Sequence, residues 1–184
     1  MKSVVVSLTL LAAAMAAQAQ QAVVPAQSEI SFTSRQMGVP VDGKFKTFSA
    51  QVAFDPAKLA ASKIAFSVDT GSADISREAN AELVKPLWFN VAAFPKATFT
   101  SSSFKRIDAT KYEVAGKLAI KGVTSDVVVP VTLAQNGATT VASGAFPIKR
   151  LSFRIGEKEW ADTSMVADEV QVKFRIALTG VPKL

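Results

Sequence analysis

The chain has 184 residues, of which 49% are hydrophobic and 20% charged, a composition typical of one globular domain. It contains no Cys and no His, which excludes disulfides, thiol nucleophiles, His-ligated metals and Ser-His-Asp triads. The 21 Lys and Arg residues outnumber the 15 Asp and Glu residues, so the formal net charge is +6. Any enzyme would have to use carboxylates, Lys, Ser, Thr or the single Tyr112. Composition therefore favours a binding protein without a metal or cofactor.

Residues 1–19 have the pattern of a secretory signal peptide. Lys2 provides a basic start, an apolar run covers residues 4–17, and Ala17-Gln18-Ala19 is a small-x-small cleavage site. The run is shorter than a comfortable membrane span, and no second apolar stretch of membrane length follows it. We therefore expect cleavage after Ala19, a periplasmic location, and a mature chain with no stable membrane insertion.

After Pro25 the chain alternates between apolar and polar residues with the period of a β-strand. The alternation is clearest over residues 169–178 and 111–120. Further strands are expected over residues 28–35, 48–54, 63–69, 98–107, 126–133, 139–147 and 148–155. Turn residues separate many of these stretches, and Pro130 demotes its own stretch to an edge or a bulge. We expect a single all-β domain over residues 22–180, with about eight antiparallel strands in a sandwich or a barrel.

One interval, between Gly71 and Pro86, has helical spacing instead. Ile75, Ala79 and Leu83 recur at every fourth position, and Pro86 would end the helix. Asp74 is the expected N-cap. An aromatic loop, Leu87-Trp88-Phe89, follows.

The inward faces of such strands either fill a core or line a lumen. In a barrel of about eight strands the interior is just wide enough to be packed solid or to hold one small ligand. The spacing of residues does not distinguish these two outcomes. A structural or interaction barrel with a filled core therefore stands beside a ligand carrier as a hypothesis.

Several motifs, taken in order, resemble the family of YceI-like proteins. They begin with Gly43-Lys44-Phe45-Lys46-Thr47-Phe48, and the strand ending Ser67-Val68-Asp69-Thr70 follows. Further matches are Trp88-Phe89-Asn90 with Phe94-Pro95-Lys96-Ala97-Thr98-Phe99, the Gly116 to Thr124 hairpin, Phe153-Arg154-Ile155-Gly156, and Asp168-Glu169-Val170. Order and spacing hold from about residue 28 to residue 178.

The resemblance implies an extended antiparallel lipocalin-like barrel with one short helix and no catalytic activity. It also implies a lumen that holds a polyprenyl chain, an isoprenoid quinone or an acyl amide, for transport, storage or a stress-related role. Combining it with the alternation, we predict these lumen or mouth residues: Phe48, Phe54, Trp88, Phe89, Phe99, Val114, Leu118, Phe153, Val172 and Phe174. Polar contacts are predicted from Arg35 and Gln36. Barrels of this family also pair, so a homodimer is expected as one possibility.

The chain departs from the family pattern where many members carry His. Gln36 precedes Met37-Gly38 in place of one His, and Glu82 precedes Leu83 in place of another. Gln36 donates and accepts hydrogen bonds but does not titrate, and Glu82 would repel a phosphate. The substitutions favour a neutral head group, such as a quinone or an amide, over a pyrophosphate.

Three carboxylates, Glu157, Glu159 and Asp162, surround Trp160 in one loop. A glycosidase requires two opposed carboxylates, one of them with a raised pKa, so a carboxylate hydrolase is the least favoured alternative. Charged residues so close in sequence more often form a solvated turn. Basic residues are dispersed along the chain, which argues against nucleic acid as a partner.

Overall fold

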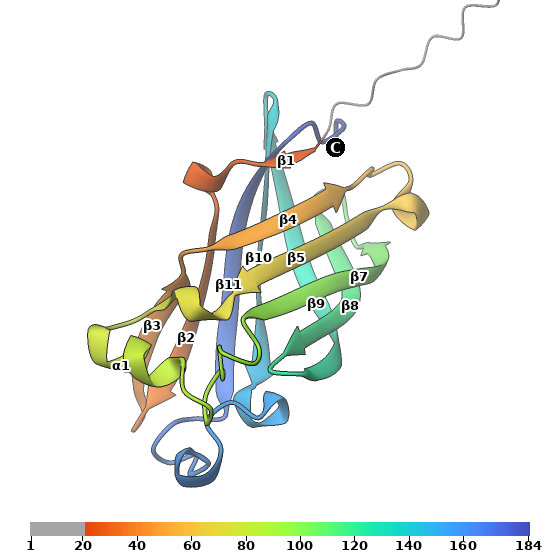
Figure 1. Ribbon diagram of the computed structural model, residues 1–184. Helices are drawn as coiled ribbons and strands as arrows, with labels where there is room; N and C mark the ends of the chain where they lie inside the picture. Colours follow the sequence, from red (N-terminus) through yellow and green to blue (C-terminus); the bar gives the residue numbers. More distant parts are fainter. Residues whose placement is uncertain (1–20) are drawn as a thin grey trace, which may run out of the picture.

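The computed structural model describes residues 21–184, so the predicted signal peptide lies outside the described residues. In this part of the chain, eleven strands form one antiparallel sheet. They are β1 (Ala22–Val23), β2 (Glu29–Gln36), β3 (Val39–Phe45), β4 (Phe48–Ala53), β5 (Lys63–Asp69), β6 (Ala73–Asp74), β7 (Lys96–Arg106), β8 (Lys111–Ile120), β9 (Val123–Asn136), β10 (Thr139–Lys149) and β11 (Glu169–Thr179). One helix, α1 (Arg77–Leu83), lies beside β3 and β6 (Figure 1). No helix in the described range has the length and hydropathy needed to cross a membrane.

The sheet curls because two of its strands are bent at a shared corner. The strand order is β4-β5-β7-β8-β9-β10-β11-β2-β3-β6, with β1 added to β11. β3 continues into β4 across Lys46 and Thr47, and β5 continues into β6 across residues 70–72. Lys46 N donates to Ser72 O at 3.1 Å, and Asp69 N donates to Thr47 O at 3.0 Å. These bonds join the two bends, so the ends of the strand order meet and the strands enclose an interior (Figure 1).

The all-β, barrel-like class predicted from the sequence is confirmed, with eleven strands in place of about eight. The difference arises mainly at the corner, where each of two long strands is divided by its bend. β3 was not among the expected strands, because Pro40, Asp42 and Gly43 are turn-forming residues. Its inward face is formed by residues 39, 41, 43 and 45, which pair with β2.

Two other local predictions were wrong. Residues 148–155 were expected to form a strand, but β10 ends at Lys149 and a 3₁₀ turn covers Arg150–Phe153. The chain turns there because the Arg150 side chain enters the interior. The N-cap of α1 is Ser76, whose Oγ accepts from Ala79 N at 3.2 Å, and not Asp74. Asp74 instead accepts from Asn80 Nδ2 at 3.0 Å and pairs with Lys46.

Pro130 lies where β9 has a partner on one side only. The ladder between β9 and β10 ends at Thr132 and Ser143, whereas β9 remains paired with β8 as far as Val123. A residue without a backbone N–H is tolerated at such a local edge. The same divergence accommodates Pro147 on β10, which pairs with Gln171 of β11.

Aromatic rings on the inner face lie directly against glycines of neighbouring strands. Gly144 pairs with Phe174, and a Cβ built on Gly144 would lie 2.6 Å from the Phe174 ring and 2.2 Å from the Pro130 carbonyl oxygen. Phe32 lies over Gly43 in the same way, and Phe99 lies over Gly116. Glycine is therefore required at these positions, because any larger residue would meet the ring.

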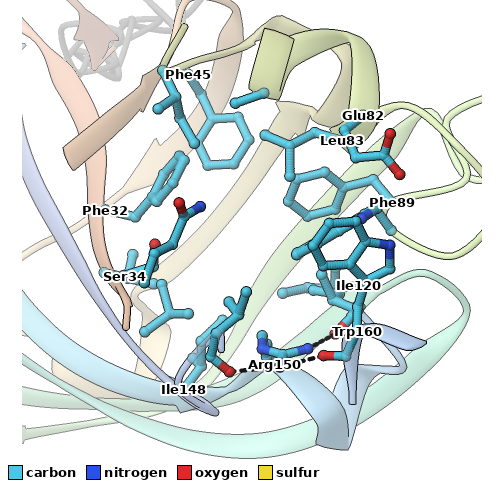
Figure 2. Close-up of a pocket in the computed structure, with 18 of the residues that line it drawn as sticks. Phe32, Ser34, Phe45, Glu82, Leu83, Phe89, Ile120, Ile148, Arg150 and Trp160 are labelled. Carbon is cyan, nitrogen blue, oxygen red and sulfur yellow. Dashed lines mark hydrogen bonds between the residues drawn. The ribbon is translucent and has the colours of Figure 1, made fainter. Parts of the chain in front are cut away.

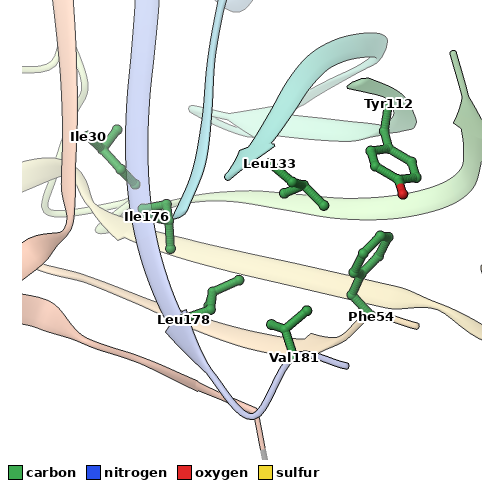
Figure 3. Close-up of a cluster of buried hydrophobic side chains, with 7 residues drawn as sticks. All are labelled: Ile30, Phe54, Tyr112, Leu133, Ile176, Leu178 and Val181. Atoms are coloured by element: carbon green, nitrogen blue, oxygen red, sulfur yellow. The ribbon is translucent and has the colours of Figure 1, made fainter. Parts of the chain in front are cut away.

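The end of the barrel near β1 is packed solid. Ile30, Leu133, Ile176 and Leu178 meet Phe54, Tyr112 and Val181 there, each 8% exposed or less except Val181 at 9% (Figure 3). The Phe54 and Tyr112 rings meet edge to face, with centroids 5.4 Å apart. We call this region the packed end. The barrel is thus closed by its own side chains on one side of its interior.

Gly144→Ala tests the close packing of rings over glycines. The new methyl group would meet a backbone carbonyl, which a side-chain rotation cannot relieve, so we expect a loss of about 2 kcal/mol in the free energy of unfolding. Denaturant unfolding followed by circular dichroism measures it. Gly71→Ala is the control, because its Cβ would lie 3.2 Å from a Val91 methyl group. Equal stability of the two variants would contradict this account.

Candidate functional site

A cavity of about 480 Å³ occupies the opposite end of the interior from the packed end. Alternate residues of several strands line it, as expected when one face of each strand points inward. The strands contribute Ile30, Phe32, Ser34, Gln36, Phe45, Val68, Ala97, Leu118, Ile120, Phe146, Ile148, Val170 and Val172. Helix α1 and its flanks contribute Ile75, Ser76, Glu78, Ala79, Glu82 and Leu83. The size lies within the range of about 300–1,000 Å³ that is usual for small-molecule sites.

The cavity wall is mostly apolar. Figure 2 shows Phe32, Phe45, Leu83, Phe89, Ile120 and Ile148 around the open space. The polar lining groups are Ser34, Gln36, Ser76, Glu78 and Glu82, together with Arg150. A site of this kind binds an apolar chain by removing it from water and provides few groups for directional chemistry.

Helix α1 forms one wall because its apolar residues recur once per turn. Ile75, Ala79 and Leu83 all line the cavity, in agreement with the spacing in the sequence. Ile75 N donates to Asn80 Oδ1 at 2.8 Å, which fixes the start of the helix. After the helix, Leu83 O and Lys85 O accept from Phe89 N and Trp88 N, so the chain turns and both aromatic residues reach the cavity.

The floor of the cavity is a loop, residues 150–168, held by the side chain of Arg150. This guanidinium is 2% exposed and donates to five carbonyl oxygens. The acceptors are Ala167 O at 3.1 Å, Ile155 O at 2.9 Å, Gly156 O at 2.8 Å, Trp160 O at 2.7 Å and Val166 O at 2.7 Å. Figure 2 shows Arg150 below the open space, beside Trp160. Because its donors are satisfied within the protein, Arg150 shapes the floor and is not free to bind a ligand's head group.

The charge on Arg150 is solvated by carbonyl dipoles and has no paired carboxylate. Burial lowers the pKa of Arg150 from its ordinary value, and the more distant Asp168 partly opposes this effect. The guanidinium lies 5.9 Å from the centre of the Trp88 ring, which adds a cation–π contact. Gly156 is required beside it, because a Cβ there would lie 2.3 Å from the Arg150 Nη1 atom.

The two Trp residues of the chain meet at the floor. Trp88 and Trp160 both line the cavity, and their ring centroids are 5.3 Å apart. Trp88 is 8% exposed, and its Nε1 atom is buried without a hydrogen-bond partner. Since the chain has only two Trp residues, its intrinsic fluorescence reports on the floor of the cavity.

The carboxylates of the floor loop do not converge on one another. Glu157 accepts from Arg154 Nε at 3.0 Å and pairs with Lys121 Nζ at 3.2 Å. The hydrogen bond from Arg154, followed by that from Lys121, lowers the pKa of Glu157. Asp162 accepts from the hydroxyl and the backbone N–H of Ser164, which lower the pKa of Asp162. A general acid of a glycosidase needs the opposite shift.

The predicted lumen residues divide between the two ends of the barrel. Trp88, Phe89, Leu118, Val172 and Gln36 line the cavity. The structure places the remaining residues elsewhere: Phe48, Phe54 and Phe174 pack in or against the packed end, Phe99 and Phe153 pack with Trp88 and Leu118 without lining the cavity, and Val114 is buried opposite Phe104 and Val129. Arg35 is exposed and donates to Gly38 O at 3.2 Å. Contact of any of them with a ligand stays a prediction.

Several lining residues were not among the predicted lumen residues. Phe32 alternates with polar residues on β2, a strand that was expected, so the period of two could have found it. Phe45 lies on β3 and could have been found only once β3 was recognised as a strand. Trp160 and Met165 come from the irregular floor loop, and no periodic signal marks them.

Arg150→Met tests the role of the guanidinium in holding the floor loop. The change leaves five buried carbonyls without a donor, so we expect unfolding to become easier by more than about 3 kcal/mol. We also expect Trp fluorescence to shift towards that of exposed indole. Arg154→Met is the control, because its side chain is 66% exposed and makes one ion pair, with Glu157. A loss in the control as large as in Arg150→Met would contradict the assigned role.

A model of the YceI-like domain matches residues 22–178. Among solved structures, BcnA of Burkholderia cenocepacia is 48% identical, with a TM-score of 0.82, over 84% of this chain and 98% of that one. The YCEI protein of Campylobacter jejuni is 25% identical, with a TM-score of 0.68, over 74% of this chain and 83% of that one. A polyisoprenoid binding domain from Saccharophagus degradans, implicated in plant cell wall breakdown, shares the fold with 12% identity and a TM-score of 0.70, over 87% of this chain and 98% of that one.

Protein YceI of Salmonella arizonae is a curated relative that is 37% identical over 92 residues. The matched region covers 50% of this chain and 46% of that protein, so the chain spans about half the length of the curated relatives it matches.

Proposed function

The chain belongs to the YceI-like family, and we propose that it is an exported carrier that holds one long apolar molecule in the cavity beneath α1. The observation that carries the proposal is the cavity itself, a mostly apolar space of about 480 Å³ that adjoins the packed end. Each buried methylene of a ligand's tail gains about 0.8 kcal/mol. A dry apolar wall therefore binds a tail tightly without specific polar contacts.

The proposed ligand is an isoprenoid chain, an isoprenoid quinone or an acyl amide. The Saccharophagus domain with the same fold is a polyisoprenoid binding domain, which supports an isoprenoid tail. The lining of this cavity also supports an apolar ligand. Aromatic and branched side chains form its walls, and Arg150, the cation among the described lining residues, has its donors satisfied by backbone carbonyls. We propose no catalytic step, and the signal-peptide pattern of residues 1–19 supports a periplasmic location.

The orientation of the ligand follows from the placement of polar groups. Gln36, Ser34, Glu78 and Glu82 lie among the lining residues of β2 and α1, whereas the Arg150 donors at the floor are already satisfied. A tail therefore enters first and meets Trp88 and Trp160, and the polar head stays near the mouth. This arrangement places the tail where its burial gains most and leaves the head in contact with water.

Filling the cavity tests the proposal directly. Ala97→Phe places a ring among the lining residues, so we expect it to weaken binding of geranylgeraniol and hexadecanamide at least about tenfold, because it displaces buried tail groups. Quenching or shift of Trp fluorescence measures binding. Ala119→Phe is the matched control, since Ala119 is on β8 between two lining residues and points to the outer face. If the wild type takes up no member of a prenyl and acyl panel, the proposed function fails.

A second prediction concerns the head group. Glu78 and Glu82 at the mouth disfavour an anionic head, so hexadecanamide is expected to bind more tightly than hexadecyl phosphate, which has a tail of the same length. Changing Glu78→Gln and Glu82→Gln together should raise the affinity for the phosphate about threefold to tenfold and leave that for the amide nearly constant. Competition against a fluorescent fatty acid analogue measures both. Unchanged discrimination in the double variant would show that these carboxylates do not select the head group.

A further inference from the structure

Three exposed apolar side chains form a rim beside the mouth of the cavity. Met37 is 70% exposed, Val39 62% and Met165 49%. Met37 and Met165 also line the cavity, and Val39 pairs with the lining residue Gln36. Met37 N donates to Met165 O at 2.9 Å, which holds the β2–β3 turn against the floor loop. The rim is thus one fixed surface that continues into the cavity wall.

Local structure gives no reason for a large apolar side chain at Met37. This residue has a φ of 48° and Gly38 a φ of 81°, so both occupy the left-handed region within the β2–β3 turn. Gly, Asn and Asp are the usual residues in that conformation. Met37 gains little from packing, because most of its side chain is in water. A contact made outside the folded chain would account for both features.

We propose that the rim docks on the surface of a bilayer that contains anionic lipid, and that a ligand's tail passes there between the bilayer and the cavity. The proposal rests on the proposed function, because a tail of this kind exposes costly apolar surface whenever it crosses water. The rim leads directly to the cavity lining, so a tail that enters beside Met37 and Met165 remains in apolar surroundings.

The size of the rim and the charge of the chain favour a bilayer over a protein partner. A stable protein interface needs about 800 Å² on each partner, and three side chains at the tip of a turn and a loop are far from supplying it. Residues 21–184 carry 20 Lys and Arg against 15 Asp and Glu, a net charge of +5. Arg35 is exposed near the end of β2, beside this turn. This balance favours an anionic surface.

Vesicle flotation with the protein free of added ligand tests the docking. Wild-type protein should float with vesicles of equal parts phosphatidylglycerol and phosphatidylethanolamine, and less so with phosphatidylcholine alone. Met37→Ser combined with Val39→Ser should lower the floated fraction about fivefold, because less apolar surface enters the lipid. Val128→Ser is the matched control, since Val128 is 58% exposed on β9 and does not line the cavity. Circular dichroism verifies that each variant is folded.

A site-specific label separates docking through the rim from general adsorption. The chain has no Cys, so Met37→Cys and Val128→Cys each accept one polarity-sensitive fluorophore. On anionic vesicles, the emission of the label at position 37 should shift to the blue, and that of the label at 128 should not. Equal shifts at both positions, or no flotation of the wild type, overturn the proposal. A blue shift at position 37 that appears at high protein concentration without vesicles also overturns it, since a second copy of the chain would then cover the rim. None of these outcomes affects the fluorescence test of cavity binding.

Discussion

Five backbone carbonyls converge on one guanidinium, and that convergence holds the loop that forms the floor of the cavity. The floor loop has no regular sheet partner over most of its length, so its carbonyls need donors from elsewhere. Arg150 supplies them from the end of β10 and orders Ile155, Trp160 and Val166 in a single contact region. A neutral side chain of the same length would fill the space and leave the loop unsupported. Arginine supplies five N–H donors at one point, and its positive charge comes with them. The dipoles of the surrounding carbonyls offset the cost of burying that charge.

The barrel combines a solid end and a hollow end in one continuous sheet. At the packed end, Ile176, Leu178 and Tyr112 fill the interior and are nearly inaccessible to solvent. At the other end, β9 and β10 diverge beyond their last ladder pair, and α1 lines part of the cavity. The same alternation of apolar residues therefore yields a packed core in one half and a cavity in the other.

Much of the architecture follows from period-two alternation, and the limits of that signal are physical. The strand expected over residues 63–69 coincides with β5, and the spacing of Ile75, Ala79 and Leu83 located the helix. Alternation tells which face a residue occupies but not its height along the barrel. Phe48 and Phe174 share the inner face with the lining residues but lie at the packed end. Phe99 and Phe174 are turned aside by glycines on adjacent strands, a relation that is visible only once the register is known. The floor loop depends on Arg150, whose burial no local pattern reveals.

Helix α1 lines the cavity and is not part of the strand ladders. Its start is anchored by Asn80 and Asp74, and its end leads into the turn that carries Trp88. Displacing it outward would disturb side-chain packing and a few local hydrogen bonds, whereas displacing any strand would break a row of backbone bonds. The width of the cavity is therefore easier to adjust on the side of α1 than on the side of the strands. Under the proposed function, a slender acyl chain and a methyl-branched prenyl chain would both fit if the helix moved slightly and the strands did not.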